Sequence, residues 1–73
     1  MRKHGVVKWF NDKTGFGFIT DVDDGTEYWV HWTGINIPEK FKKLKEGEKV
    51  TFALGSNDKG SIAIDVRREE EQS

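Results

Sequence analysis

The residues best suited to chemistry lie in one aromatic and basic stretch, residues 8–19, which reads KWFNDKTGFGFI. It holds four aromatic rings, two lysines and two glycines. Aromatic side chains stack on flat π systems such as nucleobases, and lysines neutralise phosphates. The combination therefore indicates a surface for a polyanion with flat rings, provided that the aromatic side chains face the solvent.

The alternation of glycine and phenylalanine in residues 15–19 predicts where two of those rings point. Side chains of a β-strand alternate between two faces, so Phe16 and Phe18 share one face and Gly15 and Gly17 share the other. Glycines on the inner face suit a strand that bends sharply around a small barrel. They disfavour the alternative of a buried aromatic stripe, and we expect Phe16 and Phe18 to face outward.

Length and composition limit the class of protein. The 73 residues suffice for one small domain, and an apolar fraction of 34% makes such a domain marginally stable. The absence of cysteine excludes a disulfide framework and a thiolate metal site. No apolar run suits a signal peptide or a membrane span, and nothing requires a dimer, so we expect a monomeric cytoplasmic protein with no membrane association.

The net charge of −1 hides an uneven distribution of charged residues. Residues 1–20 carry a net charge of +3 and residues 32–55 carry +2, whereas residues 21–31 carry −4. The basic excess thus coincides with the aromatic stretch and with a later loop. Residues 69–73 form an acidic tail, which we place outside a domain of residues 1–68.

Five short strands are predicted from β-branched and aromatic runs that alternate with turn residues. Four of them cover residues 5–10, 15–20, 26–32 and 48–54, and the fifth contains Ile62, Ile64 and Val66. A long connection, residues 33–47, separates the third strand from the fourth. This pattern predicts an all-β fold, a five-stranded antiparallel Greek-key barrel of the oligonucleotide-binding type.

Strand alternation also predicts which side chains fill the barrel. The inward positions of the last two strands are Val50, Phe52, Leu54, Ile62, Ile64 and Val66. In the third strand, Trp29 and His31 share one face, beside Phe16 and Phe18 if the register agrees. Tyr28, Val30 and Trp32 take the other face.

Three segments resemble the bacterial cold-shock proteins and the cold-shock domain: residues 5–11 (GVVKWFN), residues 15–19 (GFGFI) and Val30-His31. The similarity covers residues 5–67, and KWFN together with GFGFI is a highly specific combination. The resemblance implies an oligonucleotide-binding barrel that binds single-stranded RNA and DNA, often as an RNA chaperone.

The resemblance also implies roles for individual residues. The base-stacking positions are Trp9, Phe16, Phe18, Trp29, His31, Trp32 and Phe41. The positions near polar or backbone contacts are Lys8, Asn11, Asp12 and Lys59, with Lys13 one residue before the place where the family usually has a lysine. For Trp9 the resemblance disagrees with simple alternation, which turns this ring inward in register with Val7.

Departures from the family pattern concern the same surface. Thr14 stands where a lysine is usual, and Trp29 and Trp32 replace the more usual phenylalanines. The loop around Ile37-Pro38 is about one residue longer than is typical, which affects the placement of Phe41.

Other functions have weaker support. An enzyme would need a nucleophile with its base, a phosphate-cradling loop or a metal cluster, and none is recognisable. His31 could ligate a metal ion, but only His4 could join it. We therefore expect no catalytic residue, metal ion or cofactor. A protein-interaction module stays open, because small barrels with exposed rings also bind proline-rich or methylated peptides; the lysines beside the rings favour a polyanion.

Overall fold

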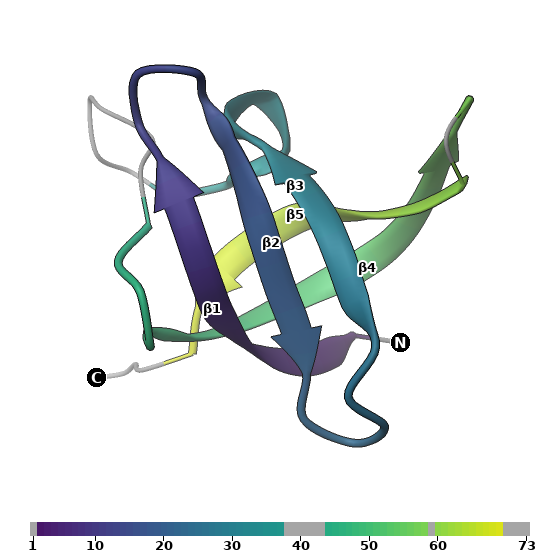
Figure 1. Cartoon of the computed structure of the whole chain (residues 1–73). Helices are drawn as coiled ribbons and strands as arrows, with labels where there is room; N and C mark the ends of the chain where they lie inside the picture. Colours follow the sequence, from purple (N-terminus) through teal and green to yellow (C-terminus); the bar gives the residue numbers. More distant parts are fainter. Residues whose placement is uncertain (1, 38–43, 59, 70–73) are drawn as a thin grey trace.

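Five strands form a closed barrel in the computed structural model, which describes residues 2–37, 44–58 and 60–69. The elements are β1 (Lys3–Asn11), β2 (Phe16–Asp21), β3 (Glu27–His31), the 3₁₀ helix η1 (Trp32–Gly34), β4 (Lys49–Asn57) and β5 (Gly60–Arg68). Their order around the barrel is β1-β2-β3-β5-β4. β1, β2 and β3 form one face, and β4 and β5 cross behind it (Figure 1). The predicted all-β barrel class is confirmed. No helix within the described residues is long and apolar enough to cross a membrane.

The predicted antiparallel barrel has one parallel seam, between β3 and β5. β3 and β5 run in the same direction, with Trp29 opposite Ile62, and a parallel bridge joins Ile35 to Val66. The other four neighbouring pairs are antiparallel. The reason is geometric: five strands in a closed ring cannot all alternate in direction, so at least one pair of neighbours must be parallel.

The core consists of apolar side chains from all five strands and from the described parts of the connection between η1 and β4. It contains Val7, Ile19, Val30, Ile35, Ile37, Leu44, Val50, Phe52, Ala63 and Val66. Phe52 is completely buried, as predicted, and Tyr28 packs on it with 5.6 Å between ring centroids. Burying each such side chain contributes about 1.5 to 3 kcal/mol, so these residues supply most of the stability of a chain this short.

Two residues predicted to be inside are exposed. Leu54 is 48% exposed, because it lies beyond Phe52, the last residue of β4 that pairs with β1. The β4–β5 hairpin extends beyond the barrel (Figure 1). Ile64 is 37% exposed, because the β5 backbone breaks its alternation at Asp65, which has a φ of 51°. The register between β4 and β5 shifts at the same place.

The side chain of Asp65 is held at this irregularity by two partners from elsewhere in the chain. Its Oδ1 accepts a hydrogen bond of 2.8 Å from Asn36 Nδ2, and its Oδ2 accepts one of 2.8 Å from Arg2 Nη1. The Asn36 bond and the nearby guanidinium groups lower the pKa of Asp65. The kink in β5 is therefore fixed by charged and polar contacts, which a pattern of apolar residues does not reveal.

Asp21 is a buried carboxylate at the end of β2 that stabilises the turn between β2 and β3. Its Oδ1 accepts a hydrogen bond of 2.8 Å from the backbone N–H of Asp23, and Lys3 Nζ lies 3.0 Å from its Oδ2. The Asp23 N–H and, after it, the Lys3 ammonium lower the pKa of Asp21. The same ion pair raises the pKa of Lys3. The ionised form of Asp21 therefore stabilises the folded state.

We expect Asp21→Asn to destabilise the fold at neutral pH and to reduce its sensitivity to acid. Because folding lowers the pKa of Asp21, its contribution is fully present above the unfolded value of about 4 and is lost as the pH falls through the lowered pKa. Urea unfolding at a series of pH values between about 7 and about 2 measures this. The stability of the wild type should fall more steeply than that of Asp21→Asn.

Asp23→Asn is the matched control, because it removes one charge from an exposed residue of the same turn. This control should keep the acid sensitivity of the wild type. Equal pH dependence in the wild type and Asp21→Asn would contradict the role given to the buried carboxylate.

Candidate nucleic-acid interface

The strand registers align aromatic residues on the outer face of β1, β2 and β3. Trp9 lies opposite Phe18, and Phe18 lies opposite Trp29, so these three residues form a row across the strands. Phe16 lies opposite His31 one row further along. Directly opposed residues in an antiparallel pair have side chains on the same face. The registers therefore bring together rings that are up to 22 positions apart in the sequence, from Trp9 to His31.

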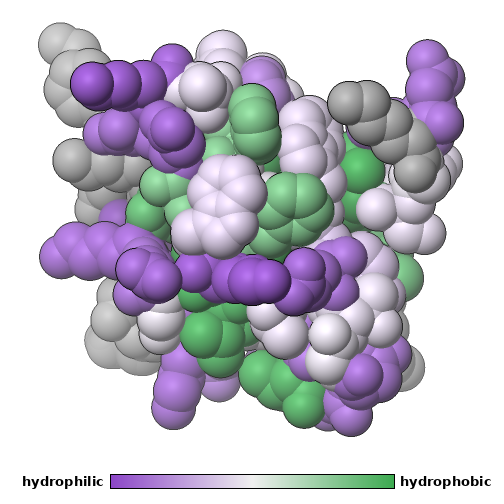
Figure 2. Space-filling view, in the orientation of Figure 1, coloured by the Kyte–Doolittle hydropathy of each residue, from purple (hydrophilic) through white to green (hydrophobic). Residues whose placement is uncertain are grey.

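The rings form a continuous series of contacts. The centroid of Trp9 lies 5.4 Å from that of Phe18 and 6.1 Å from that of Phe16, and Phe16 lies 6.0 Å from Trp29. His31 lies 5.6 Å from Trp29 and 5.6 Å from Trp32. We call these six residues the aromatic platform: Trp9, Phe16, Phe18, Trp29, His31 and Trp32. Figure 2 shows the same side of the molecule, where weakly polar and apolar surface over β1 to β3 is bounded by a strongly hydrophilic band.

Trp9 faces outward, so the inward orientation given by simple alternation is wrong. The register of β1 against β2 shifts between Val7 and Trp9. At such a bulge two successive residues can lie on one side of the sheet. Lys8 and Trp9 are accordingly both exposed, with Trp9 at 37%, while Phe10 packs partly against the core. The position implied by the family resemblance is the one that the bulge produces.

Trp32 also lies on the surface, as its predicted stacking role requires, and not beside Val30 on the inner face, which strand alternation alone gives. β3 ends at His31, and Trp32 begins η1 with its side chain 49% exposed. Its backbone N–H donates a hydrogen bond of 2.7 Å to the carbonyl of Gly15. Gly15 has a φ of 84°, and a Cβ there would lie 2.5 Å from Trp32 Cδ1. Glycine at this position thus allows the positive φ of the turn and leaves room for the indole ring of Trp32.

Gly17 allows β1 and β2 to approach closely behind the rings. A Cβ at Gly17 would lie 2.2 Å from the backbone oxygen of Trp9 and 2.7 Å from Phe10 Cα. Both obstacles are backbone atoms, which cannot move aside as the end of a side chain can. The close approach of β1 and β2 behind the platform therefore requires glycine at position 17.

Asn11 shapes the turn between β1 and β2. Its Oδ1 accepts hydrogen bonds from the backbone N–H of Lys13 at 2.9 Å and of Thr14 at 3.3 Å. The Thr14 hydroxyl donates to the Asn11 carbonyl at 3.3 Å. Thr14, which stands where the family usually has a lysine, therefore closes the turn, while Asp12 and Lys13 are exposed beside the platform.

Lys8 forms an ion pair with a residue that no motif of the sequence points to. Its Nζ donates a hydrogen bond of 2.6 Å to Glu27 Oε2, and both side chains are about half exposed. Lys8 lies on β1 and Glu27 on β3, so the pair spans β2 on the outer face. One of the lysines expected to meet phosphate is thus already neutralised within the chain.

A groove beside the platform is a further feature that the sequence does not predict. It has a volume of about 490 Å³ and lies between the rings of β2 and β3 and the start of β5. Its lining consists of Phe16, Phe18, Glu27, Trp29, Asn57, Ser61 and Ile62. The parallel seam brings β5 next to Trp29. No local sequence pattern predicts that β3 and β5 are neighbours. Two other predicted site residues, Phe41 and Lys59, lie outside the described residues.

Comparison with known proteins places this geometry in a family. Residues 3–69 match the family model described as the 'Cold-shock' DNA-binding domain. The chain is 48% identical over 64 residues to Cold shock protein 1 of Lactiplantibacillus plantarum, covering 88% of this chain and 94% of the relative. It is 48% identical over 63 residues to a Cold shock-like protein of Thermotoga maritima, covering 86% and 92%. It is 45% identical over 62 residues to Cold shock-like protein CspB of Escherichia coli, covering 85% and 86%.

The match covers almost the whole chain, and the relatives are matched over most of their own length. The chain therefore belongs to the cold-shock domain family. It is a nucleic-acid-binding protein of the cold-shock class, and proteins of this family are not enzymes. The family resemblance expected from KWFN, GFGFI and Val30-His31 is confirmed.

Proposed function

We propose that the chain binds single-stranded RNA and DNA by stacking unpaired bases on the aromatic platform. The supporting observation is the continuous series of six rings across three neighbouring strands, with contacting centroids 5.4 to 6.1 Å apart. Stacking one base on an aromatic side chain contributes about 1 to 3 kcal/mol with little sequence preference. Base faces are hidden in a duplex, so this mode of binding favours single strands.

A protein that binds single strands in this way acts as an RNA chaperone without nucleotide hydrolysis. A protein that binds only the unpaired form of a weak hairpin shifts the equilibrium toward that form by mass action. All six residues of the platform come from one chain, which supports action as a monomer. We expect this activity in the cytoplasm. Lys13, Asp12 and Asn11 lie at the end of the platform, where we expect contacts with the strand backbone, and we keep Phe41 and Lys59 as proposed contacts.

Tryptophan fluorescence tests the proposal directly, because all three tryptophans of the chain, Trp9, Trp29 and Trp32, belong to the platform. Titration with a short oligothymidine should give strong, saturable quenching, and the same strand paired with its complement should quench far less. No change with any single strand, together with saturable quenching by a proline-rich peptide, would overturn the proposal in favour of the peptide-binding alternative.

Glu27 should weaken nucleic-acid binding, because it competes with phosphate for Lys8. We expect Glu27→Gln to raise affinity for oligothymidine a few-fold at low salt. The variant should also steepen the dependence of log affinity on log salt by up to about 0.7, the increment for one phosphate neutralised on a single strand. Titrations at several salt concentrations measure both effects.

Glu46→Gln is the charge-matched control for this prediction, because Glu46 is exposed in the turn before β4. It changes the net charge equally but frees no platform lysine. An equal gain of affinity in both variants would show that net charge alone is responsible and that the Lys8–Glu27 ion pair is irrelevant.

A further inference from the structure

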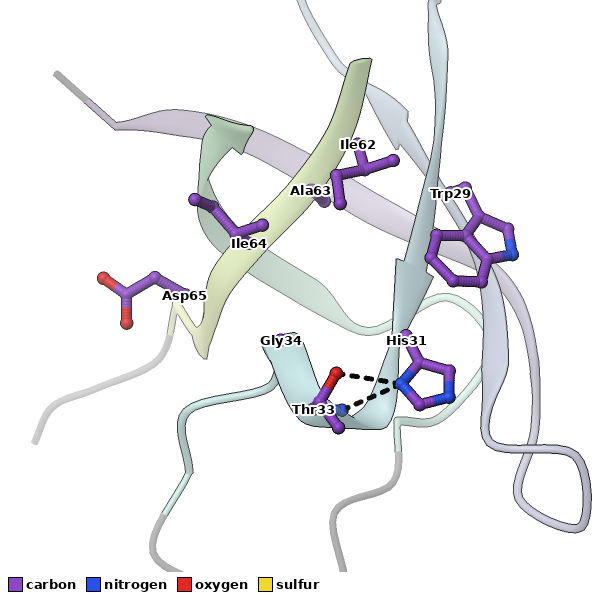
Figure 3. A pocket seen from close by; sticks show the side chains of 8 residues that line it. All are labelled: Trp29, His31, Thr33, Gly34, Ile62, Ala63, Ile64 and Asp65. Carbon is purple, nitrogen blue, oxygen red and sulfur yellow. Dashed lines mark hydrogen bonds between the residues drawn. The ribbon is translucent and has the colours of Figure 1, made fainter. Parts of the chain in front are cut away.

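His31 occupies a special place in the platform, because its ring lies between two indoles. It stacks on Trp29 with an interplanar angle of 23°, and Trp32 lies against it at 38°. Beside it, a pocket of about 390 Å³ opens between the end of β3, η1 and β5 (Figure 3). Stacking uses only the face of the ring and does not involve its two nitrogens, which can form hydrogen bonds.

One of those nitrogens is turned back toward the chain. His31 is the N-cap of η1, and its Nδ1 accepts a hydrogen bond of 3.3 Å from the backbone N–H of Thr33. The hydroxyl Oγ1 of Thr33 lies 2.9 Å from the same nitrogen (Figure 3). A backbone N–H can only donate, so Nδ1 must present a lone pair. A proton on Nδ1 would point at another proton.

The position of the remaining ring proton follows from this geometry. In a neutral imidazole one nitrogen is a donor and the other is an acceptor. With Nδ1 as the acceptor, the proton is on Nε2. Nε2 lies on the side of the ring away from Thr33 and has no hydrogen-bond partner among the described residues (Figure 3). The free nitrogen is therefore a donor.

We propose that Thr33 is a positioning residue that fixes His31 in its Nε2–H tautomer. The platform then offers one directed hydrogen-bond donor, between two stacking surfaces, to an oxygen of the bound strand. This inference rests on the proposed function, in which bases stack on Trp29 and His31. The oxygen is either a base carbonyl or a phosphate oxygen. The other tautomer would instead present an acceptor and select an amino group.

The tautomer is measured in the free, full-length protein, before any ligand is added. A long-range ¹H–¹⁵N correlation spectrum of the imidazoles at neutral pH distinguishes a protonated ring nitrogen from an unprotonated one. His4 is the only other histidine, and His4→Gln assigns its signals. We expect a protonated Nε2 and an unprotonated Nδ1 in His31. The reverse assignment, or averaging between both tautomers, would overturn the proposal.

Variants of Thr33 test the positioning role in the same spectrum. Thr33→Val removes the hydroxyl but keeps the backbone N–H that requires a lone pair on Nδ1, so this variant and Thr33→Ser should both keep the wild-type signature. Averaging between the two tautomers in Thr33→Val would overturn the assignment of this role to the backbone N–H of Thr33.

Binding tests the donor itself. His31→Phe keeps a flat ring at this position but has no donor, and it should bind oligothymidine about three- to tenfold more weakly, the effect of one net hydrogen bond. A similar loss with oligodeoxyadenosine, whose bases carry no carbonyl, identifies phosphate as the acceptor. A loss confined to oligothymidine identifies a base carbonyl. No loss with either strand overturns the donor role, while failure of the wild type to bind any single strand overturns the proposed function instead.

Discussion

Replacing Phe16 and Phe18 together with alanine should weaken binding of oligothymidine at least about 30-fold while the barrel stays folded. Each ring that stacks a base contributes about 1 to 3 kcal/mol, so losing two removes at least about 2 kcal/mol. Both residues lie outside the buried core cluster. We therefore expect a loss of stability well below the roughly 3 to 5 kcal/mol that is typical of removing a core phenylalanine.

Fluorescence titration for affinity and thermal unfolding for stability separate the two effects. Val22→Ala is a suitable control, because Val22 is an exposed apolar residue in the turn at the opposite end of β2. It should leave affinity unchanged. If the double variant unfolds, the rings are structural; if it folds and binds like the wild type, the bases do not stack on the platform.

Gly17→Ala should have the opposite profile and destabilise the fold itself. The added methyl group would lie 2.2 Å from a backbone oxygen of β1, so the two strands would have to separate. Overpacking of this kind costs up to about 3 kcal/mol and occasionally more, against a total of about 5 to 15 kcal/mol for a typical domain. Chemical denaturation measures the loss, and binding should decline because the fold does.

Gly34→Ala provides the comparison, because its Cβ would lie 3.3 Å from the nearest atom, the carbonyl oxygen of Ala63. A small adjustment relieves that contact, so we expect less than about 1 kcal/mol of destabilisation. Equal effects at Gly17 and Gly34 would mean that the close approach of β1 and β2 is not what requires glycine at position 17.

The sequence predicts most of the barrel because its local signals agree with each other. Glycine alternating with Phe16 and Phe18 indicates both the outer face and the bend of the strand, and the alternation through Phe52 indicates the core. These patterns depend on residues two positions apart, which a strand places on one face whatever the rest of the chain does. The five-strand order then limits the topology to a closed barrel.

Strand alternation alone misplaces side chains where one residue interrupts it. The bulge at Lys8 turns Trp9 outward, and the left-handed conformation of Asp65 leaves Ile64 exposed. β3 ends before Trp32, which leaves that ring on the surface. Such interruptions depend on partners distant in the sequence, as the bonds of Asp65 with Arg2 and Asn36 illustrate. A pattern of period two contains no information about them.

The rings of the site were predictable, and its polar contacts were less so. Phe16 and Phe18 alternate with glycines and lie close to lysines in the sequence, and this local pattern already indicates an exposed binding surface. In contrast, the Lys8–Glu27 ion pair joins residues 19 positions apart across an intervening strand, and the Thr33 bonds to His31 depend on the 3₁₀ turn that follows β3. Contacts of this kind emerge only when register and strand ends are known.

The parallel seam between β3 and β5 has a consequence for the motions of the barrel. Trp29 opposite Ile62 is the one aligned pair in this seam between named strands of the described chain, whereas the antiparallel neighbours of β3 and β5 are aligned over several residues. Local opening is easiest where few backbone hydrogen bonds must break. Amide protons along this seam should therefore exchange with solvent faster than those that pair β1 with β2 and β2 with β3. We therefore expect the strands that carry Trp9, Phe18 and Trp29 to stay paired when the barrel opens locally between β3 and β5.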